Sequence, residues 1–179
     1  MAAMDPITWI QDFRPGFTVG ELIYENCDKD PMTRIYPLDD PETDQHFVVK
    51  YLCHVCELDE SEQINEQLKI ASSLSDYSGI VKLHDYSYRY GNNLFELIML
   101  MNHLTPLQDI MMETSLDDET VIQIAFDLLK GLAECHKQKL AHRDIKPENI
   151  FRNKDGHYEL GDFDISAYLQ ADNDIKGDK

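Results

Sequence analysis

Short apolar runs separated by polar turns occupy the first half of the chain. Phe17–Tyr24, Thr33–Leu38 and Phe47–Leu52 are three such runs, and Ile80–Leu83 and Leu94–Met101 follow further along. Short apolar runs bounded by turn residues are typical of buried strands. The pattern therefore predicts five strands in this half of the chain.

Between the third and the fourth of these runs, Asp59–Leu74 follows a helical pattern instead. Ile64, Leu68, Ala71 and Leu74 recur at spacings of four and three, which places them on one side of a helix. We expect one helix here, with a single apolar stripe.

The second half of the chain becomes helical. Thr105–Gln108 matches a helix start, with Thr105 as the N-cap and Pro106 in the first helical position. Ser115–Asp118 offers a second N-cap, and the helix after it is predicted to run to about Lys137.

The helix predicted over Leu116–Lys137 is apolar on nearly every side. A helix of this kind is a buried helix, yet the rest of the sequence offers too little surface to cover it. We therefore expect a second copy of the chain, or a partner protein, to cover helix 116–137. Its apolar residues include Val121, Ile122, Ile124, Ala125, Phe126, Leu128, Leu129 and Leu132.

Two short runs near the end of the chain predict a β-hairpin. Ile150–Arg152 and His157–Leu160 are joined by the turn sequence Asn153–Gly156. A strand-rich half with one helix, followed by a mainly helical half, predicts an α+β fold with two lobes. We place the boundary between residues 1–101 and 102–179.

The chain is strongly acidic, with 34 Asp and Glu residues against 16 Lys and Arg and a net charge of −18. This charge argues against nucleic acid or an anionic membrane surface as a main partner. No apolar run approaches the roughly 18 residues of a membrane span, and the first residues lack the regions of a signal peptide. We expect a cytoplasmic protein whose four cysteines are reduced thiols.

Cys53-His54-Val55-Cys56 suggests a metal site, because it brings three possible zinc ligands together. A structural zinc site needs four ligands, and no second Cys or His pair with suitable spacing is present in the sequence. We interpret the two cysteines as small residues at the end of a strand.

The sequence His142-Arg143-Asp144-Ile145-Lys146-Pro147-Glu148-Asn149 resembles the catalytic loop of the eukaryotic-type serine/threonine protein kinases. Asp162-Phe163-Asp164, 18 residues after Asp144, resembles their magnesium-binding motif, with Asp164 in place of a glycine. Phe47-Val48-Val49-Lys50 resembles the strand that carries their nucleotide-binding lysine. A turn-forming role for Asp144 and Asn149, or a surface role for Lys50, would explain each residue alone but not the joint pattern.

The resemblance implies phosphoryl transfer from ATP, with Mg²⁺, to a hydroxyl group of a protein substrate. Asp144 would accept the proton of that hydroxyl group, and Lys146 would stabilise the charge of the moving phosphoryl group. Asn149 and Asp162 would bind Mg²⁺, because their oxygen atoms suit a hard cation. His142 would be structural.

The resemblance also implies a nucleotide pocket. Lys50 would bind the α- and β-phosphates and pair with a carboxylate of the following helix. Glu66 is the best candidate by spacing, although a different alignment places Gln67 there. The pocket would have Val48 as its roof, Phe151 as its floor, Met99–Met101 as the hinge and Ile98 as the gatekeeper.

Three features depart from the family. Tyr24–Pro31, where a glycine-rich phosphate loop is expected, contains no glycine and three carboxylates, which predicts weakened or rearranged ATP binding. Asp164 adds a side chain and a charge to the metal-binding turn. The sequence stops at Lys179, so the expected fold is a β-rich N-lobe with one helix and only the first part of a helical C-lobe.

Three functions therefore compete. The first is a serine/threonine protein kinase, here as a truncated catalytic domain, and Lys146 two residues after Asp144 favours Ser/Thr over Tyr specificity by resemblance. The second is a pseudokinase that acts by binding. The third is a small-molecule phosphotransferase of related fold, which the complete catalytic-loop sequence disfavours.

Overall fold

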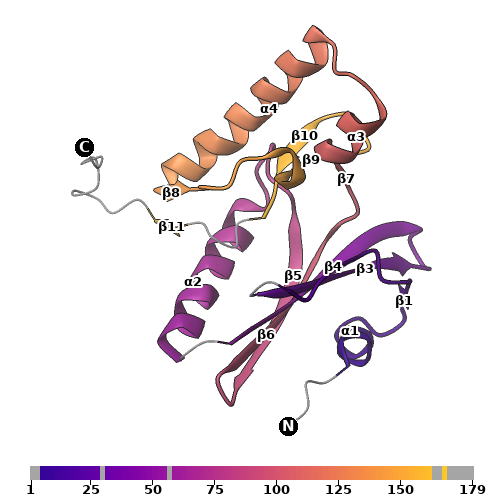
Figure 1. Ribbon diagram of the computed structural model, residues 1–179, viewed down its shortest axis with the longest axis vertical. Coiled ribbons are helices and arrows are strands. Elements are labelled where there is room, and N and C mark those ends of the chain that lie inside the picture. Colours follow the sequence, from indigo (N-terminus) through magenta and orange to yellow (C-terminus); the bar gives the residue numbers. More distant parts are fainter. Residues whose placement is uncertain (1–4, 29–30, 56–57, 163–166, 169–179) are drawn as a thin grey trace. The chain divides into compact units, whose positions relative to one another are not determined.

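The computed structural model describes residues 5–28, 31–55, 58–162 and 167–168 (Figure 1). The chain divides into two compact units. The first comprises residues 1–65 and 83–103, and the second comprises residues 66–82 and 104–179. Residues 66–82, which the sequence analysis places in the N-lobe, therefore group with the second unit.

The first unit is built on a six-stranded sheet in the order β1-β3-β4-β6-β5, with β2 also paired to β3. All the pairings within it are antiparallel. The structure confirms the predicted strand-rich first half, but β5 runs over a longer and more polar segment than the predicted Ile80–Leu83. The strands are β1 Thr18–Val19, β2 Tyr24–Asn26, β3 Met32–Asp40, β4 Gln45–Val55, β5 Leu83–Gly91 and β6 Leu94–Asn102.

Helix α1, Pro6–Phe13, covers one face of this sheet. It starts at Asp5, whose side chain accepts a hydrogen bond from the Ile7 amide, and it buries Ile10 completely. Alternate residues of β4 point to the same face, because side chains alternate along a strand. Helix α1 was not expected from the sequence. The cluster beneath it consists of Tyr36, Leu38, Phe47, Val49, Tyr51, Ile98 and Leu100.

A buried carboxylate anchors α1 to the sheet. Glu96, on β6, accepts hydrogen bonds from the Tyr51 hydroxyl group and from the Arg89 guanidinium group, each at 2.7 Å. Burial raises the pKa of Glu96, but the hydrogen bonds from Arg89 and Tyr51 outweigh it and hold the pKa below its usual value. The Arg89 guanidinium lies 4.4 Å from the Trp9 ring centroid, so the ionised pair also binds the helix.

The second unit contains the C-terminal part of α2, Leu58–Leu74, and the elements that follow β6. Helix α2 confirms the predicted helix over residues 59–74. Strands β10, β9 and β7 form one small sheet, and β11 pairs with β8. The elements are β7 Thr105–Pro106, α3 Leu107–Glu113, α4 Asp118–Lys137, β8 Leu140–Ala141, a 3₁₀ turn Pro147–Asn149, β9 Ile150–Arg152, β10 Tyr158–Leu160 and β11 Ala167–Tyr168.

Of the two predicted helix caps, the one before α4 is present and the one before α3 is not. Helix α4 begins after Asp117, whose carboxylate accepts a 2.8 Å hydrogen bond from the Thr120 amide, within the predicted Ser115–Asp118 cap. Helix α3 begins at Leu107, and Pro106 precedes it without a side-chain cap. The predicted cap at Thr105 is wrong, because Thr105 and Pro106 pair with β9 as strand β7 instead.

Helix α4 buries one side, not every side, of its surface among the described residues. Ile124, Asp127, Gly131 and Cys135 are buried and recur at helical spacing. The opposite side exposes apolar side chains, which agrees with the expectation that this part of the chain cannot cover the helix by itself, while a partner stays a prediction. The exposed side chains are Val121, Ile122, Phe126 and Leu129.

Two features are absent from the residues that the structure describes. None of their helices is both long and apolar enough to cross a membrane. Within the same residues, no group of three or more His, Cys, Asp or Glu side chains could hold a metal ion.

Candidate active site

The turn between β8 and β9 brings together three of the predicted catalytic residues. The Lys146 ammonium group donates to the Asp144 carboxylate, with Nζ 2.6 Å from Oδ2. The Asn149 side-chain amide donates to the same oxygen atom at 2.8 Å. Asp144 is therefore held from two sides, while its side chain keeps 32% of its surface exposed.

Electrostatics favour the ionised form of this pair. The hydrogen bond from Lys146 lowers the pKa of Asp144, and the hydrogen bond to Asp144 raises the pKa of Lys146. The loop thus presents a carboxylate that can accept a proton and, beside it, a cation that can stabilise negative charge.

Asn149 is the buried member of the group, with 4% of its surface exposed. Its Nδ2 atom lies 2.9 Å from the main-chain oxygen of Asp144 and 2.8 Å from the carboxylate oxygen. Two acceptors on one side fix the orientation of the amide, because only its nitrogen atom can donate to them. The Asn149 Oδ1 atom is turned away from Asp144 and presents an oxygen ligand of the kind that Mg²⁺ prefers.

His142 supports the loop from beneath. It is 2% exposed, and its Nδ1 atom accepts a 3.3 Å hydrogen bond from the Asp144 main-chain amide. The proton of the neutral ring is therefore on Nε2, which donates to the Gly161 oxygen at 2.7 Å. Burial lowers the pKa of His142 and favours this neutral form, which agrees with the structural role expected for it.

Gly161 links the catalytic loop to Asp162. Its amide donates to the Asn149 main-chain oxygen at 2.9 Å, so the two predicted metal ligands belong to one hydrogen-bonded framework. A Cβ atom on Gly161 would lie 2.9 Å from both the Phe151 and Val81 side chains, so only glycine fits. Asp162 follows in the left-handed region, with φ 64°. Phe163 and Asp164 lie outside the described residues.

The predicted nucleotide residues of the first unit share one face of its sheet. Lys50 and Val48 alternate with Val49 and Tyr51 along β4, so their side chains point away from the core beneath α1. Lys50 is paired with Met99, and Val48 is paired with Met101. Paired residues of neighbouring strands point to the same face, so the four side chains line a common surface.

Comparison with known proteins identifies the family of the chain. Residues 32–178 match the family model described as "Protein kinase domain". The chain belongs to the protein kinase family.

One curated relative is the dual specificity mitogen-activated protein kinase kinase 1 of Dictyostelium discoideum. It is 37% identical over 121 residues, which cover 65% of this chain and 18% of that protein. The chain thus corresponds to a small part of the length of this relative. Helix α1 precedes the part of the kinase chain that matches the family model.

The hinge prediction needs correction. Met99 and Met101 lie inside β6, which pairs with β4 on one side and with β5 on the other. Sheet pairing uses the main-chain groups that a hinge would offer to adenine. Strand β6 ends at Asn102, so only the side chains of the two methionines remain candidates for nucleotide contact.

The gatekeeper prediction is also wrong. Ile98 is completely buried in the cluster beneath α1, together with Val49 and Tyr51. It therefore lies on the face of the sheet opposite to Lys50. The partner of Lys50 stays a prediction, because the side chains of Glu66 and Gln67 lie outside the described part of α2.

Proposed function

We propose that this chain carries the catalytic residues of an ATP-dependent kinase that phosphorylates protein serine and threonine hydroxyl groups. The observation that supports this most directly is the arrangement of Asp144, Lys146 and Asn149. One carboxylate, one ammonium group and one oriented amide meet at Asp144 Oδ2 within 2.6–2.8 Å.

The roles of these residues follow from their chemistry. Asp144 accepts the proton of the substrate hydroxyl group, while Lys146 turns from Asp144 toward the negative charge that develops on the transferred group. Asn149 and Asp162 supply oxygen ligands, and their framework fits a hard cation. Mg²⁺, when bound there, neutralises the phosphates of ATP.

Lys50 and the surface around it are the proposed nucleotide contacts in the first unit. Lys50 binds phosphate oxygen atoms, and Val48 contacts adenine from above. Met99 and Met101 contribute side chains to the same surface. Phe151, which lies against Gly161 in the second unit, is the proposed floor.

Preference for serine and threonine rests on Lys146 at its position two residues after Asp144. The relative from Dictyostelium is named a dual specificity kinase, so tyrosine must be included in the test.

We place the activity in the cytoplasm, a compartment that supplies ATP and keeps exposed thiols such as Cys27 reduced.

A phosphotransfer assay with serine, threonine and tyrosine peptides tests the proposal. We expect Mg²⁺-dependent transfer to the first two peptides and its loss in Asp144→Asn, which keeps the size of the side chain. Ile145→Ala, at a half-exposed position in the same loop, is the matched control. Transfer that survives Asp144→Asn contradicts the assigned role of Asp144.

A pseudokinase is the second candidate, and the loop between β2 and β3 favours it. This segment contains no glycine, and its carboxylates repel phosphate. Glu25 at its base is already paired with Arg34, with Oε1 2.6 Å from Nε. Binding of Mg²⁺–ATP without any transfer to peptide would support this candidate over the kinase.

Helix α4 is the proposed surface for a partner protein or a second copy of the chain. The side chains of Ile122, Phe126 and Leu129 are 68%, 57% and 65% exposed and recur at helical spacing. Burying a side chain of this size contributes ~1.5–3 kcal/mol, so covering the stripe is strongly favourable. The acidic chain makes nucleic acid and anionic membranes poor candidates for this surface.

A further inference from the structure

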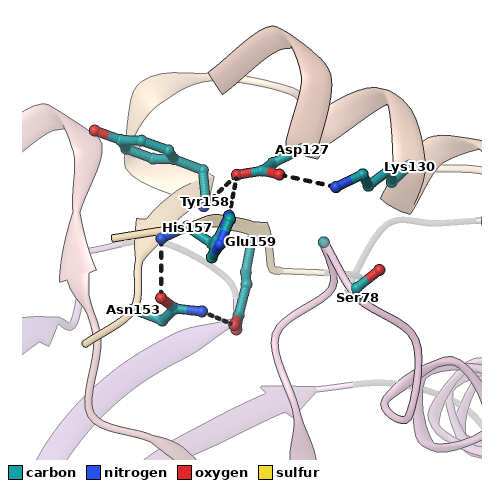
Figure 2. Close-up of a pocket in the computed structure, with 8 residues that line it drawn as sticks. Ser78, Asp127, Lys130, Asn153, His157, Tyr158 and Glu159 are labelled. Atoms are coloured by element: carbon teal, nitrogen blue, oxygen red, sulfur yellow. Dashed lines mark hydrogen bonds and ion pairs between the residues drawn. The ribbon is translucent and has the colours of Figure 1, made fainter. Parts of the chain in front are cut away.

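A buried carboxylate of α4 lies outside the proposed active site and has no role in it. The side chain of Asp127 is 4% exposed, and its Oδ2 atom accepts three hydrogen bonds. Figure 2 shows those from His157 and Tyr158. The donors are Gln123 Nε2 at 2.7 Å, the Tyr158 main-chain amide at 3.1 Å and His157 Nδ1 at 3.1 Å. The Lys130 ammonium group lies 3.4 Å from the other oxygen atom.

Asp127 is one wall of a pocket of about 200 Å³ between α4, the loop that contains Ser78 and the β9–β10 hairpin. The polar groups of this pocket bind one another, since Asn153 Nδ2 also donates to Glu159 Oε1 at 2.7 Å. Burial raises the pKa of Asp127, but the hydrogen bonds from Gln123, Tyr158 and His157 outweigh this effect. The pKa is therefore below its usual value, and the carboxylate stays ionised. The network therefore ties the hairpin to the helix.

The attachment of Tyr158 fixes the start of β10, and the end of β10 leads directly into the active site. The Leu160 amide donates to the Gly79 oxygen, and the Val81 amide donates to the Leu160 oxygen, both at 2.9 Å. The next residue is Gly161, which bonds to the main chain of Asn149 and to the ring of His142.

The helix and the loop that hold β10 are themselves in close contact. A Cβ atom on Gly79 would lie 2.5 Å from the Asp127 main-chain oxygen, and one on Gly131 would lie 2.4 Å from the Gly79 oxygen. Two main chains that approach this closely leave little room for relative movement. Strand β10 is thus held at both ends by rigid neighbours.

We propose that Asp127 is a positioning residue for Asn149 and Asp162. By fixing the first residue of β10, it sets where Gly161 binds the catalytic loop and where Asp162 begins its left-handed turn. The functional part of this inference rests on the proposed kinase function, whereas the coupling of Asp127 to Gly161 does not.

The test compares Asp127→Ala with Asp127→Asn in the full chain. Asparagine can keep its oxygen atom at the Oδ2 position and accept the same three hydrogen bonds, whereas alanine leaves the buried Tyr158 amide without a partner. Glu134→Ala removes another carboxylate from α4, and Cys135→Ala creates a small cavity in the same helix, in a cluster that contains no residue of the hairpin itself.

The first readout is amide hydrogen exchange at Tyr158 and Gly161, which requires no nucleotide. We expect exchange at both amides to be roughly tenfold faster in Asp127→Ala and within about threefold of the wild-type rate in Asp127→Asn. The second readout is the Mg²⁺ concentration that supports half-maximal ATP binding. This concentration should rise several-fold in Asp127→Ala and stay near the wild-type value in Asp127→Asn and in the two control variants.

The outcomes separate the inference from the proposed function. The inference is overturned if exchange at Gly161 is the same in Asp127→Ala as in the wild type. It is also overturned if Cys135→Ala accelerates this exchange as strongly as Asp127→Ala does. A wild-type chain that binds no Mg²⁺–ATP overturns the proposed function, while the exchange result still decides whether Asp127 positions Gly161. If Asp127→Ala does not fold, His157→Ala and Gln123→Ala remove the donors one at a time and must show smaller changes in the same direction.

Discussion

The Asn149 side-chain amide binds Asp144 twice, at its main-chain oxygen and at its carboxylate, over a separation of five residues. One buried side chain therefore fixes both the course of the loop and the orientation of the proposed base. The same contacts occupy the nitrogen atom of the amide and leave its oxygen atom as the proposed cation ligand, so positioning of the base and the proposed binding of the cation depend on one amide.

Replacing Asn149 should test both functions of this amide. In Asn149→Ala the Asp144 main-chain oxygen loses a partner in a partly buried setting, so the free energy of unfolding should fall by about 1 kcal/mol. Mg²⁺-dependent ATP binding should be lost, as measured by calorimetric titration with and without EDTA. Ile145→Ala should change the unfolding free energy by less than about 0.5 kcal/mol. Tight ATP binding that is unchanged by EDTA would contradict the proposed role of Asn149 as a Mg²⁺ ligand.

The catalytic loop could be predicted from sequence because its residues are close in the chain and their spacing is fixed. The structure brings Asp144, Lys146 and Asn149 together, while their catalytic roles stay a prediction. Gly161 and Asp127 could not be found in this way, because their importance depends on contacts with segments 12 or more residues away. The glycine before Asp162 was the one available signal, since a glycine next to a functional turn often marks a close approach.

The fold could be predicted where apolar runs were continuous and not where they were interrupted. Helix α1 has only Ile7, Trp9, Ile10 and Phe13 as its apolar positions, although Asp5-Pro6 was a recognisable start. Strand β5 is largely polar, and its alternating Tyr86, Tyr88 and Tyr90 carried the signal that was missed. The Ile98 error has a different cause, since the face of a strand depends on what packs against it.

Stability should depend on pH through His142. Its folded pKa is lowered, so the unfolded chain binds the proton more readily, and stability is lost as the pH falls below about 6.5. His142→Gln should cost about 1–3 kcal/mol at pH 7.5, because it disturbs a buried hydrogen-bond network. The difference in unfolding free energy between the wild type and His142→Gln should become smaller at pH 5, as measured by urea unfolding. His136→Gln, at an exposed position near the end of α4, is the control substitution.

Two neighbouring valines of β4 should respond in opposite ways, because they face opposite sides of the sheet. Val48→Ala enlarges the proposed adenine site, so adenine nucleotides should bind several-fold more tightly by titration calorimetry. Val49 is completely buried, and Val49→Ala should lower the unfolding free energy by about 1–3 kcal/mol without improving binding. Unchanged or weaker binding in Val48→Ala would contradict its placement on the nucleotide surface.

Helix α1 should be part of the stable core, although it precedes the segment that matches the family. Ile10→Ala should lower the unfolding free energy by about 2–5 kcal/mol, because it leaves a cavity in a completely buried site. Ile7→Ala, on the exposed side of the same helix, should cost less than about 0.5 kcal/mol. Equal effects of the two substitutions in urea unfolding would mean that α1 does not pack on the sheet in solution.

The exposed stripe of α4 should make the isolated chain associate. Total domain stability is about 5–15 kcal/mol, so leaving three large apolar side chains in water is a substantial loss. Light scattering should show a mass that grows with concentration, and the melting temperature should rise in parallel. Phe126→Ser combined with Leu129→Gln should restore a monomer, whereas Met112→Gln, 77% exposed on α3, should not. A wild-type monomer with a cooperative, concentration-independent melt would contradict the role proposed for this helix. The domain would then be stable with the apolar stripe exposed to water, so no partner would be required to cover it.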